Sequence, residues 1–235
     1  MMKSPDTCFY APELSPGRLS LSEEESFHAI RALRAKVGDT LNLTDGKGNL
    51  ARGKIEKADA RCCILQVESV EPSKTPKPKL HLGIACLKDD ANEEVALHVG
   101  EMEVASITLL RTERSEEPKD SGLQKTIRRC ERKALVSLKQ SLKAWMTEIR
   151  GPIPFEEWLS HYDGDLVLCD INGDDDAGEI LKETTLLVGP EGGFSPREID
   201  LVKQHGRGDV KLLKLGKTRL RARTAAIVGI GKLIR

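Results

Sequence analysis

The spacing of apolar residues divides the chain into two parts with different periodicities. Ser22 and Glu25 have the spacing of a capping box, and apolar residues follow at helical intervals, so the sequence predicts a short helix that begins at Glu23. Beyond it the apolar positions alternate, as at Leu41 and Leu43, which is typical of half-buried strands. We therefore expect the first part of the chain to form a small β-rich domain.

Three prolines between residues 71 and 78 mark the end of this first part. Beyond them, short apolar runs alternate with helical patterns, with strands near 80–86, 104–110, 166–170, 186–188 and 210–213 and helices near 92–101, from 122, from 196 and at the C-terminus. Alternation of this kind favours an α/β fold with a mostly parallel sheet covered by helices. The sequence thus predicts a β domain over residues 1–72 and an α/β domain over residues 73–235.

Composition excludes several classes of protein. With 39% hydrophobic and 31% charged residues among 235, the chain is neither disordered nor membranous. Its apolar runs fall far short of the roughly 20 residues that a bilayer span needs, and the N-terminus leads into no apolar signal core. We therefore expect a cytoplasmic protein without membrane contact.

The six cysteines lack C-x-x-C spacing and the five histidines are scattered, so we predict reduced, buried thiols and no metal site.

Charge is balanced overall but unevenly distributed. The 37 Lys and Arg residues equal the 37 Asp and Glu residues, which argues against a simple basic nucleic-acid-binding domain. The net charge is nevertheless −10 over residues 151–210 and +8 over residues 211–235, where no acid occurs. This asymmetry indicates contact with a polyanion or a local anion site.

Two glycine-containing loops follow consecutive predicted strands. The first, residues 189–193, leads into a second capping box with Ser195 as cap and Glu198 as partner, and the second begins at Gly216 and carries cations into the last helix. Neither loop has P-loop or G-x-G-x-x-G spacing. Glycines at the carboxyl end of a parallel strand let a ligand approach the backbone closely. Each loop alone is compatible with an ordinary turn or a solvated basic loop, but two in succession favour a shared ligand site.

The predicted helix near residues 122–146 is amphipathic and carries a basic ridge. Five cations fall within a stripe about 60° wide that contains no acid, and apolar residues lie on the far side. At about 27 Å, the ridge is long enough to follow several phosphates of a nucleic acid; a solvated charged face is the alternative. The ridge consists of Lys125, Arg128, Arg132, Lys139 and Lys143.

Taken together, these segments resemble the RsmE family, which are bacterial 16S rRNA uridine-N3 methyltransferases of the SPOUT superfamily. The resemblance covers nearly the whole chain and rests on motifs in matching order, namely HAIRALR at 28–34, GD at 38–39, DGKG at 45–48, TERS at 112–115, VGPEGG at 188–193, LG at 215–216, LR at 220–221 and TA at 224–225. It implies a small PUA-like β-barrel followed by an α/β domain with a deep C-terminal trefoil knot. It also implies S-adenosylmethionine as cofactor and a homodimer.

The resemblance also implies particular site residues. By position, Arg31, Arg34 and Arg114 would contact RNA. The N3 atom of uridine is a weak nucleophile until its proton leaves, so we expect Arg221 to stabilise negative charge on the uracil carbonyls and Glu191 to accept the proton. The implied cofactor contacts are Leu168, Cys169, Gly189, Pro190, Glu191, Gly192, Leu215, Gly216, Leu220 and Arg221.

The sequence departs from the commonest family pattern at several positions. The change at Arg223 replaces a glutamate beside Arg221, and this keeps open an alternative function as a non-catalytic RNA-binding or ribosome-associated protein. Because a near-neutral molecule with local basic surfaces should bind bulk RNA weakly, we expect the 16S rRNA substrate to lie within the assembled small ribosomal subunit. The other departures are Glu103, Leu142, Lys143, Thr218 and Arg219.

Overall fold

The structure, a computed structural model, describes residues 8–77, 79–115 and 120–234. By packing, the chain forms two compact units: Met1–Thr75 with Leu135–Met146, and Pro76–Ala134 with Thr147–Arg235. Chain order alone therefore does not define the units, because the segment Leu135–Met146 packs with the N-terminal one. The boundary at residue 72 stays a prediction about domains along the chain.

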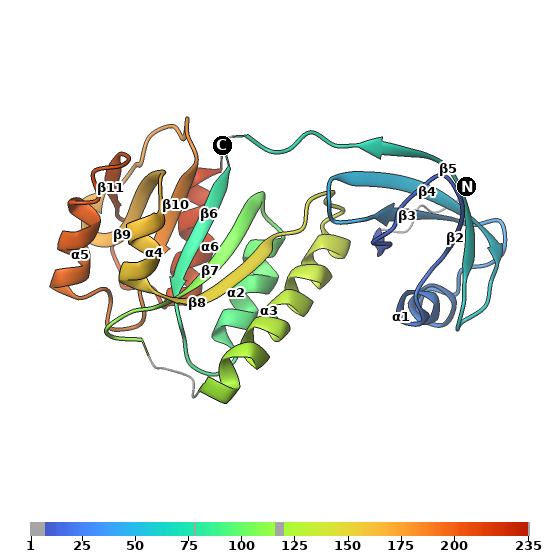
Figure 1. Ribbon diagram of the computed structural model, residues 1–235, viewed down its shortest axis with the longest axis horizontal. Coiled ribbons are helices and arrows are strands. Elements are labelled where there is room, and N and C mark those ends of the chain that lie inside the picture. Colours follow the sequence, from blue (N-terminus) through green and yellow to red (C-terminus); the bar gives the residue numbers. More distant parts are fainter. Residues whose placement is uncertain (1–7, 78, 116–119, 235) are drawn as a thin grey trace. The chain divides into compact units, whose positions relative to one another are not determined.

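The N-terminal unit is built on a five-stranded sheet with the order β1-β3-β4-β5-β2. Strands β2, β3, β4 and β5 of this sheet are labelled in Figure 1. Its core contains Phe9, Leu43 and Leu65, all fully buried. This is the β-rich unit that the alternation of apolar residues predicts. Its elements are β1 (Cys8–Tyr10), β2 (Gly17–Ser20), α1 (Glu23–Phe27), the π-helical turn η1 (His28–Ala32), β3 (Thr40–Thr44), β4 (Asn49–Lys57) and β5 (Ile64–Pro72).

Helix α1 begins at Glu23, as predicted, but only half of the expected capping box forms. The Ser22 Oγ atom accepts a hydrogen bond from the backbone N–H of Glu25 at 3.2 Å. The Glu25 carboxylate, whose side chain is 6% exposed, instead accepts a hydrogen bond from Lys139 Nζ at 2.6 Å. Glu25 therefore joins the helix start to the segment Leu135–Met146.

The glycines of the turn at residues 45–48 allow that segment to pack closely. The N–H of Gly48 donates to the Ala144 carbonyl at 2.9 Å, and the N–H of Met146 donates to the Gly46 carbonyl at the same distance. A Cβ atom on Gly48 would overlap the indole ring of Trp145. This turn therefore needs glycine both for its backbone conformation and for its close contact.

We expect Gly48→Ala to destabilise the N-terminal unit more than Gly17→Ala does. Gly48 and Gly17 have φ values of +106° and +107°. Replacing either one by alanine therefore has a similar cost in backbone conformational energy. Only Gly48 faces Trp145, whereas nothing lies within 4 Å of a Cβ atom built on Gly17. The free energy of unfolding should fall by about 1–3 kcal/mol more for Gly48→Ala, as overpacking costs. Equal losses in denaturant unfolding would show that the Trp145 contact is not the cause.

The second unit contains a six-stranded sheet in which every pairing is parallel, and this confirms the predicted α/β class. The strand order is β11-β9-β10-β6-β7-β8. Helix α3 begins in this unit and ends in the other. The elements are β6 (Leu80–Ala85), α2 (Ala91–Gly100), β7 (Val104–Arg111), α3 (Asp120–Gln140), β8 (Glu148–Pro154), α4 (Phe155–His161), β9 (Asp165–Asp174), β10 (Thr184–Val188), α5 (Pro196–Lys203), β11 (Val210–Leu213) and α6 (Ala222–Leu233).

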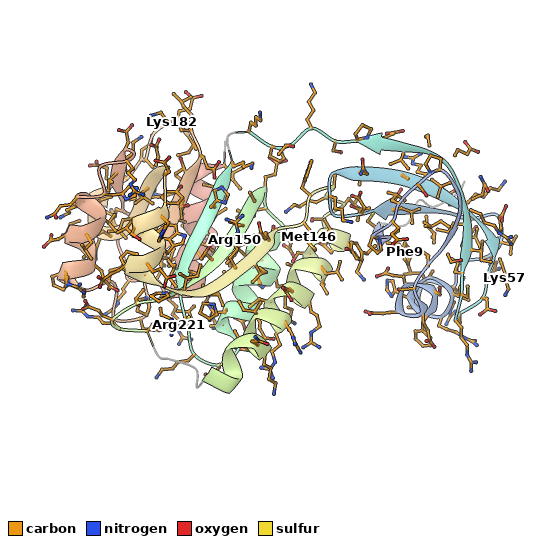
Figure 2. The ribbon with its side chains drawn as sticks, in the orientation of Figure 1. Phe9, Lys57, Met146, Arg150, Lys182 and Arg221 are labelled. Carbon is orange, nitrogen blue, oxygen red and sulfur yellow. The ribbon has the colours of Figure 1, made fainter. Side chains whose placement is uncertain are left out.

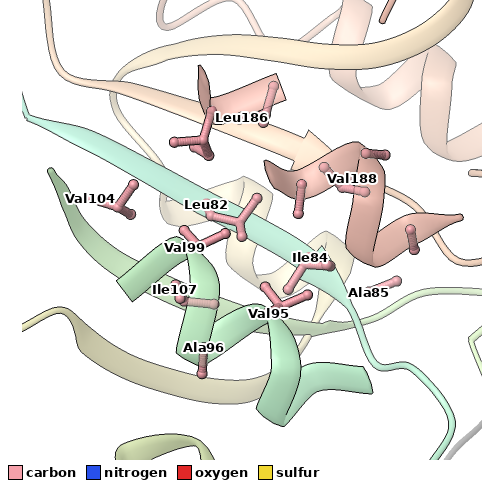
Figure 3. Packing of buried hydrophobic residues seen from close by; sticks show 14 of the residues in the cluster. Leu82, Ile84, Ala85, Val95, Ala96, Val99, Val104, Ile107, Leu186 and Val188 are labelled. Carbon is pink, nitrogen blue, oxygen red and sulfur yellow. The ribbon is translucent and has the colours of Figure 1, made fainter. Parts of the chain in front are cut away.

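Helices cover both faces of this sheet. On one face, Val95 and Val99 of α2 pack toward Leu82 and Ile84 of β6 in a core that α6 completes (Figure 3). On the other face, α4 and α5 pack over a second cluster that includes Leu187 of β10. Because all the strands are parallel, their carboxyl ends lie along one edge, where the loops at 86–91, 189–195 and 214–221 gather.

Strand β8 and helix α4 were not predicted. The sequence of β8 contains Gly151, Pro152 and Pro154, a composition typical of a loop. The structure accommodates these residues because β8 is an edge strand, where missing ladder hydrogen bonds cost little. The trefoil knot that the family resemblance implies stays a prediction.

Candidate functional site

A cavity of about 440 Å³ opens at the carboxyl ends of β10 and β11, beside residues 168–171 in the middle of β9. Nine of the ten residues predicted to contact a cofactor line it, and only Arg221 does not. The segments brought together here are separated in sequence but adjacent at this edge of the sheet. The lining consists of residues 168–171, 188–194, 199, 213–216, 218–220, 222 and 225.

Close packing within the first glycine loop accounts for its glycines. A Cβ atom on Gly189 would lie 2.9 Å from the backbone nitrogen of Phe194. Gly193 has a φ of +68°, and its N–H donates to the Pro190 carbonyl at 2.8 Å. An alanine at position 189 would therefore displace backbone atoms of the loop that lines the cavity.

Two arginines hold the carbonyl groups of this loop. Arg114 Nη1 donates to the carbonyl oxygens of Gly192, at 2.8 Å, and of Phe194, at 3.3 Å. Arg219 Nη2 donates to the Glu191 carbonyl oxygen. Arg114, which the resemblance places at RNA, thus also fixes the loop that lines the cavity, and its RNA contact stays a prediction.

The loop leads into helix α5 through the capping box that the sequence predicts. Ser195 Oγ accepts from the N–H of Glu198 at 3.1 Å, and the N–H of Ser195 donates to Glu198 Oε2 at 2.8 Å. Glu198 Oε1 also accepts from the N–H of Glu113 at 2.9 Å. The segments 112–115 and 192–198 are consequently joined by hydrogen bonds between side chains and backbone groups.

Two residues in the middle of β9 line the cavity, and the sequence predicted only one of them as a site residue. Burial raises the pKa of the Cys169 thiol to about 12, so at neutral pH this side chain is an uncharged wall of the cavity and not a nucleophile. Asp170 also lines the cavity, and its Oδ1 atom accepts from the N–H of Asn172 at 2.8 Å. The sequence predicted that the strand ends at Asp170, whereas β9 continues to Asp174, and it gave no reason to select the Asp170 carboxylate.

A second cavity, of about 550 Å³, shares Glu191 and Gly192 with the first. Its other walls are the loop 86–91, Arg114, Arg221 and Arg223. Figure 2 shows Arg221 at the edge of the sheet where the arrow of β6 ends. The two residues predicted to be catalytic, Glu191 and Arg221, therefore line one cavity. The loop 86–91 was missed, although its position after the first parallel strand was the signal that could have identified it.

The unusual Arg223 has an acidic partner on another helix. Its guanidinium pairs with the carboxylate of Glu94 on α2. Arg223 lies in the first turn of α6, where a positive charge is unfavourable to the helix dipole, and a carboxylate alongside offsets this effect. Position 223 thus carries a positive charge where the family pattern has a negative one, and it forms an ion pair with Glu94.

The basic ridge on α3 is shorter than the sequence predicted. Lys125, Arg128 and Arg132 are exposed, but Lys139 is only 18% exposed and forms the ion pair with Glu25. Lys143 lies beyond α3, which ends at Gln140. Helical periodicity therefore identifies an exposed basic surface at Lys125, Arg128 and Arg132, but this surface does not extend to Lys139 and Lys143.

We expect the salt dependence of RNA binding to separate the two groups of cations. Each phosphate contact contributes about −0.9 to the slope of log affinity against log salt concentration. Replacing both Arg128 and Arg132 by alanine should therefore make the slope less steep by up to about 2, whereas Lys139→Ala should leave the slope unchanged and lower the thermal stability. A slope that changes for Lys139→Ala and not for the double variant would contradict the assignment.

Arg31 and Arg34 lie in the N-terminal unit and are exposed. Arg31 is part of the π-helical turn η1, and Arg34 has a φ of +56°, which is uncommon for a residue other than glycine. Irregular backbone of this kind is often found at functional sites. Their contact with RNA stays a prediction.

The described part of the chain contains no helix that is long and apolar enough to cross a bilayer. Within the same residues, no three His, Cys, Asp or Glu side chains are grouped so that they could hold a metal ion.

The chain matches two families of RNA methyltransferase domains. Residues 73–234 match the family described as "RNA methyltransferase domain", and residues 21–68 match the family described as "RNA methyltransferase PUA domain". A Synechocystis protein named ribosomal RNA small subunit methyltransferase E is 28% identical, over 95% of this chain and 75% of its own. The Aquifex aeolicus protein of the same name is 24% identical, over 93% and 95%.

Solved structures of similar fold cover nearly the whole chain. A putative methyltransferase from Legionella pneumophila, determined with bound S-adenosylmethionine, has 28% identity and a TM-score of 0.79, covering 96% of this chain and 94% of its own. A probable rRNA methyltransferase from Porphyromonas gingivalis has 29% identity and a TM-score of 0.78, covering 96% and 95%. With its SPOUT-type α/β domain and its N-terminal PUA domain, the chain belongs to the RsmE family of RNA methyltransferases.

Proposed function

We propose that this protein methylates 16S rRNA of the small ribosomal subunit, with S-adenosylmethionine as methyl donor and N3 of a uridine as acceptor. The observation that carries the proposal is the pair of cavities that share Glu191 and Gly192. One has the glycine-rich lining of a cofactor site, and the other gathers charged side chains. Family membership and the names of the relatives support the same activity.

The first cavity fits S-adenosylmethionine in size and in chemistry. Its volume of about 440 Å³ lies within the range of small-molecule sites. Leu168, Val188 and Leu220 offer apolar surface to an adenine ring, while the backbone at Gly189 and Gly216 can approach polar groups closely. When bound, the cofactor supplies an electrophilic methyl group on its sulfonium.

The residues at the shared wall have the chemistry that N3 methylation requires. The nitrogen must release its proton and use the freed electron pair to form the bond to the methyl carbon, while the pair of the broken carbon–sulfur bond stays on sulfur. Glu191 lines both cavities and is our proposed acceptor of that proton. Arg221 lines the second cavity, where its positive charge would stabilise negative charge on the uracil carbonyls.

We assign RNA contact to the exposed cations Lys125, Arg128 and Arg132 of α3 and to Arg31 and Arg34 of the N-terminal unit. These local positive surfaces belong to a chain with a net charge of zero, so shape and assembled structure should contribute much of the selectivity. We therefore propose the assembled small subunit as substrate, a homodimer as the active form and the cytoplasm as the location.

Cofactor titration separates the methyltransferase from a non-catalytic RNA-binding protein of the same fold. We expect isothermal titration of the purified protein to detect saturable binding of S-adenosylmethionine. We also expect binding of the product S-adenosylhomocysteine, since both share the adenosine that the first cavity would hold. A protein that binds ribosomal RNA but neither nucleoside would favour the non-catalytic function.

A further inference from the structure

The second cavity contains charges of both signs. Phosphate sites gather cations and neutral hydrogen-bond donors and lack carboxylates, whereas metal sites gather carboxylates and other oxygen ligands. A mixed lining is suited to a neutral ligand with both hydrogen-bond donors and acceptors, such as a nucleoside. The charged residues are Lys88, Arg114, Arg221 and Arg223 on the positive side and Asp89, Asp90 and Glu191 on the negative side.

Some of these side chains already form hydrogen bonds or ion pairs within the protein, and others do not. Arg114 donates to the carbonyls of Gly192 and Phe194, and Arg223 pairs with Glu94. Within the part of the chain that the structure describes, the side chains of Arg221 and Asp89 make no hydrogen bond or ion pair. Their hydrogen-bonding capacity is thus available to a ligand.

The backbone at Asp89 is unusual and well anchored. Asp89 has a φ of +54°, in the left-handed region that residues other than glycine adopt infrequently. The loop on which it lies is fixed by the buried side chain of Asn92, whose Oδ1 accepts from the N–H of Leu87 at 2.9 Å and whose Nδ2 donates to the Ala85 carbonyl at 3.3 Å. An aspartate is therefore held in an uncommon backbone conformation at the wall of a cavity, a feature that is often found at functional positions.

The shape of a uridine determines which end faces which wall. If N3 is to meet the methyl group, the N3 edge of the base must lie at the wall that the cavities share, beside Glu191 and Gly192. The ribose is attached at N1, away from that edge, and so it lies toward the rest of the lining, which includes the loop 86–91. Ribose hydroxyls are donors, and a carboxylate is a suitable acceptor for them.

We propose that the second cavity takes the methyl-accepting uridine, extruded from its RNA strand, and that Asp89 accepts a hydrogen bond from its ribose 2′-hydroxyl. This inference rests on the proposed methyltransferase function and assigns the site of its acceptor nucleoside. Extrusion of the target nucleotide is how enzymes reach an atom buried in stacked or paired RNA. Reading the 2′-hydroxyl makes Asp89 a residue that distinguishes RNA from DNA.

Methyl transfer to small subunits that lack the mark tests the role of Asp89. We expect Asp89→Ala to lower kcat/KM about 10- to 100-fold, as loss of a hydrogen bond to a charged group does. The affinity for S-adenosylmethionine should stay unchanged, because Asp89 does not line the first cavity. Asp200→Ala on α5, an exposed aspartate outside both cavities, is the matched control and should behave as the wild type.

Competition by mononucleotides tests the ligand directly. Uridine 5′-monophosphate should inhibit methyl transfer by the wild type more strongly than its 2′-deoxy analogue, and Asp89→Ala should remove that preference. Equal inhibition of the wild type by the two nucleotides, or none by either, would overturn the proposal, as would a kcat/KM for Asp89→Ala equal to that of the wild type. If the wild type transfers no methyl group although it binds both substrates, the proposed function itself fails.

Discussion

Arg221→Ala is expected to lower the rate of methyl transfer about 100- to 1,000-fold while S-adenosylmethionine still binds. Removal of one group that stabilises developing negative charge typically has an effect of this size. Arg221 lines the second cavity and not the first, and its side chain forms no hydrogen bond or ion pair with the described residues. Single-turnover methyl transfer at saturating cofactor measures the rate, and calorimetry measures cofactor binding.

Two further variants define the origin of the effect. Arg221→Lys keeps the charge but not the planar guanidinium, so it should retain activity between those of the wild type and the alanine variant. Arg207→Ala removes an arginine that donates to the Ser160 carbonyl, outside both cavities, and it should transfer methyl groups at the normal rate. An unchanged single-turnover rate for Arg221→Ala would contradict the electrostatic role.

Gly189→Ala is expected to lower the affinity for S-adenosylmethionine about 10- to 100-fold. The added methyl group would lie 2.9 Å from the backbone nitrogen of Phe194, and the loop that lines the first cavity would have to move. Overpacking of this kind costs about 1–3 kcal/mol, which corresponds to that range of affinity. Calorimetric titration of the folded variant with S-adenosylmethionine measures the loss.

A second glycine provides the control for this substitution. A Cβ atom on Gly231 of α6 would meet only Met102 Cε, at 3.7 Å, an ordinary contact. Gly231→Ala should therefore bind the cofactor normally, and its helix should be slightly more stable. Equal affinities for Gly189→Ala and the wild type would show that the tight packing of the loop does not govern cofactor binding.

The first cavity could be predicted from the sequence because local chemistry and topology agree there. An apolar strand followed by Gly189 and Gly192 indicates a close backbone approach, and parallel strands bring their carboxyl ends to one edge. The second cavity was missed because the loop 86–91 contains no glycine, and its Asp89 adopts a left-handed conformation that the sequence does not signal. Arg221 was selected, but only the structure separates it from the first cavity.

Long-range packing accounts for the features that the sequence did not predict. Lys139 belongs to a basic stripe by periodicity, but periodicity does not show that the end of α3 belongs to the N-terminal unit and that Lys139 pairs there with Glu25. The same carboxylate was expected to complete a local capping box. Strand β8 was missed because its prolines are tolerated only at a sheet edge, and edge position is a property of the whole sheet.

Nucleoside mass spectrometry of the reaction product tests the central claim most directly. Small ribosomal subunits that lack the modification would be incubated with the protein and S-adenosylmethionine labelled in its methyl group, and the 16S rRNA would then be digested to nucleosides. We predict that the label appears in N3-methyluridine and that Arg221→Ala greatly reduces it. Label in a 2′-O-methylated or 5-methylated nucleoside, or no label from a protein that binds both substrates, would contradict this account.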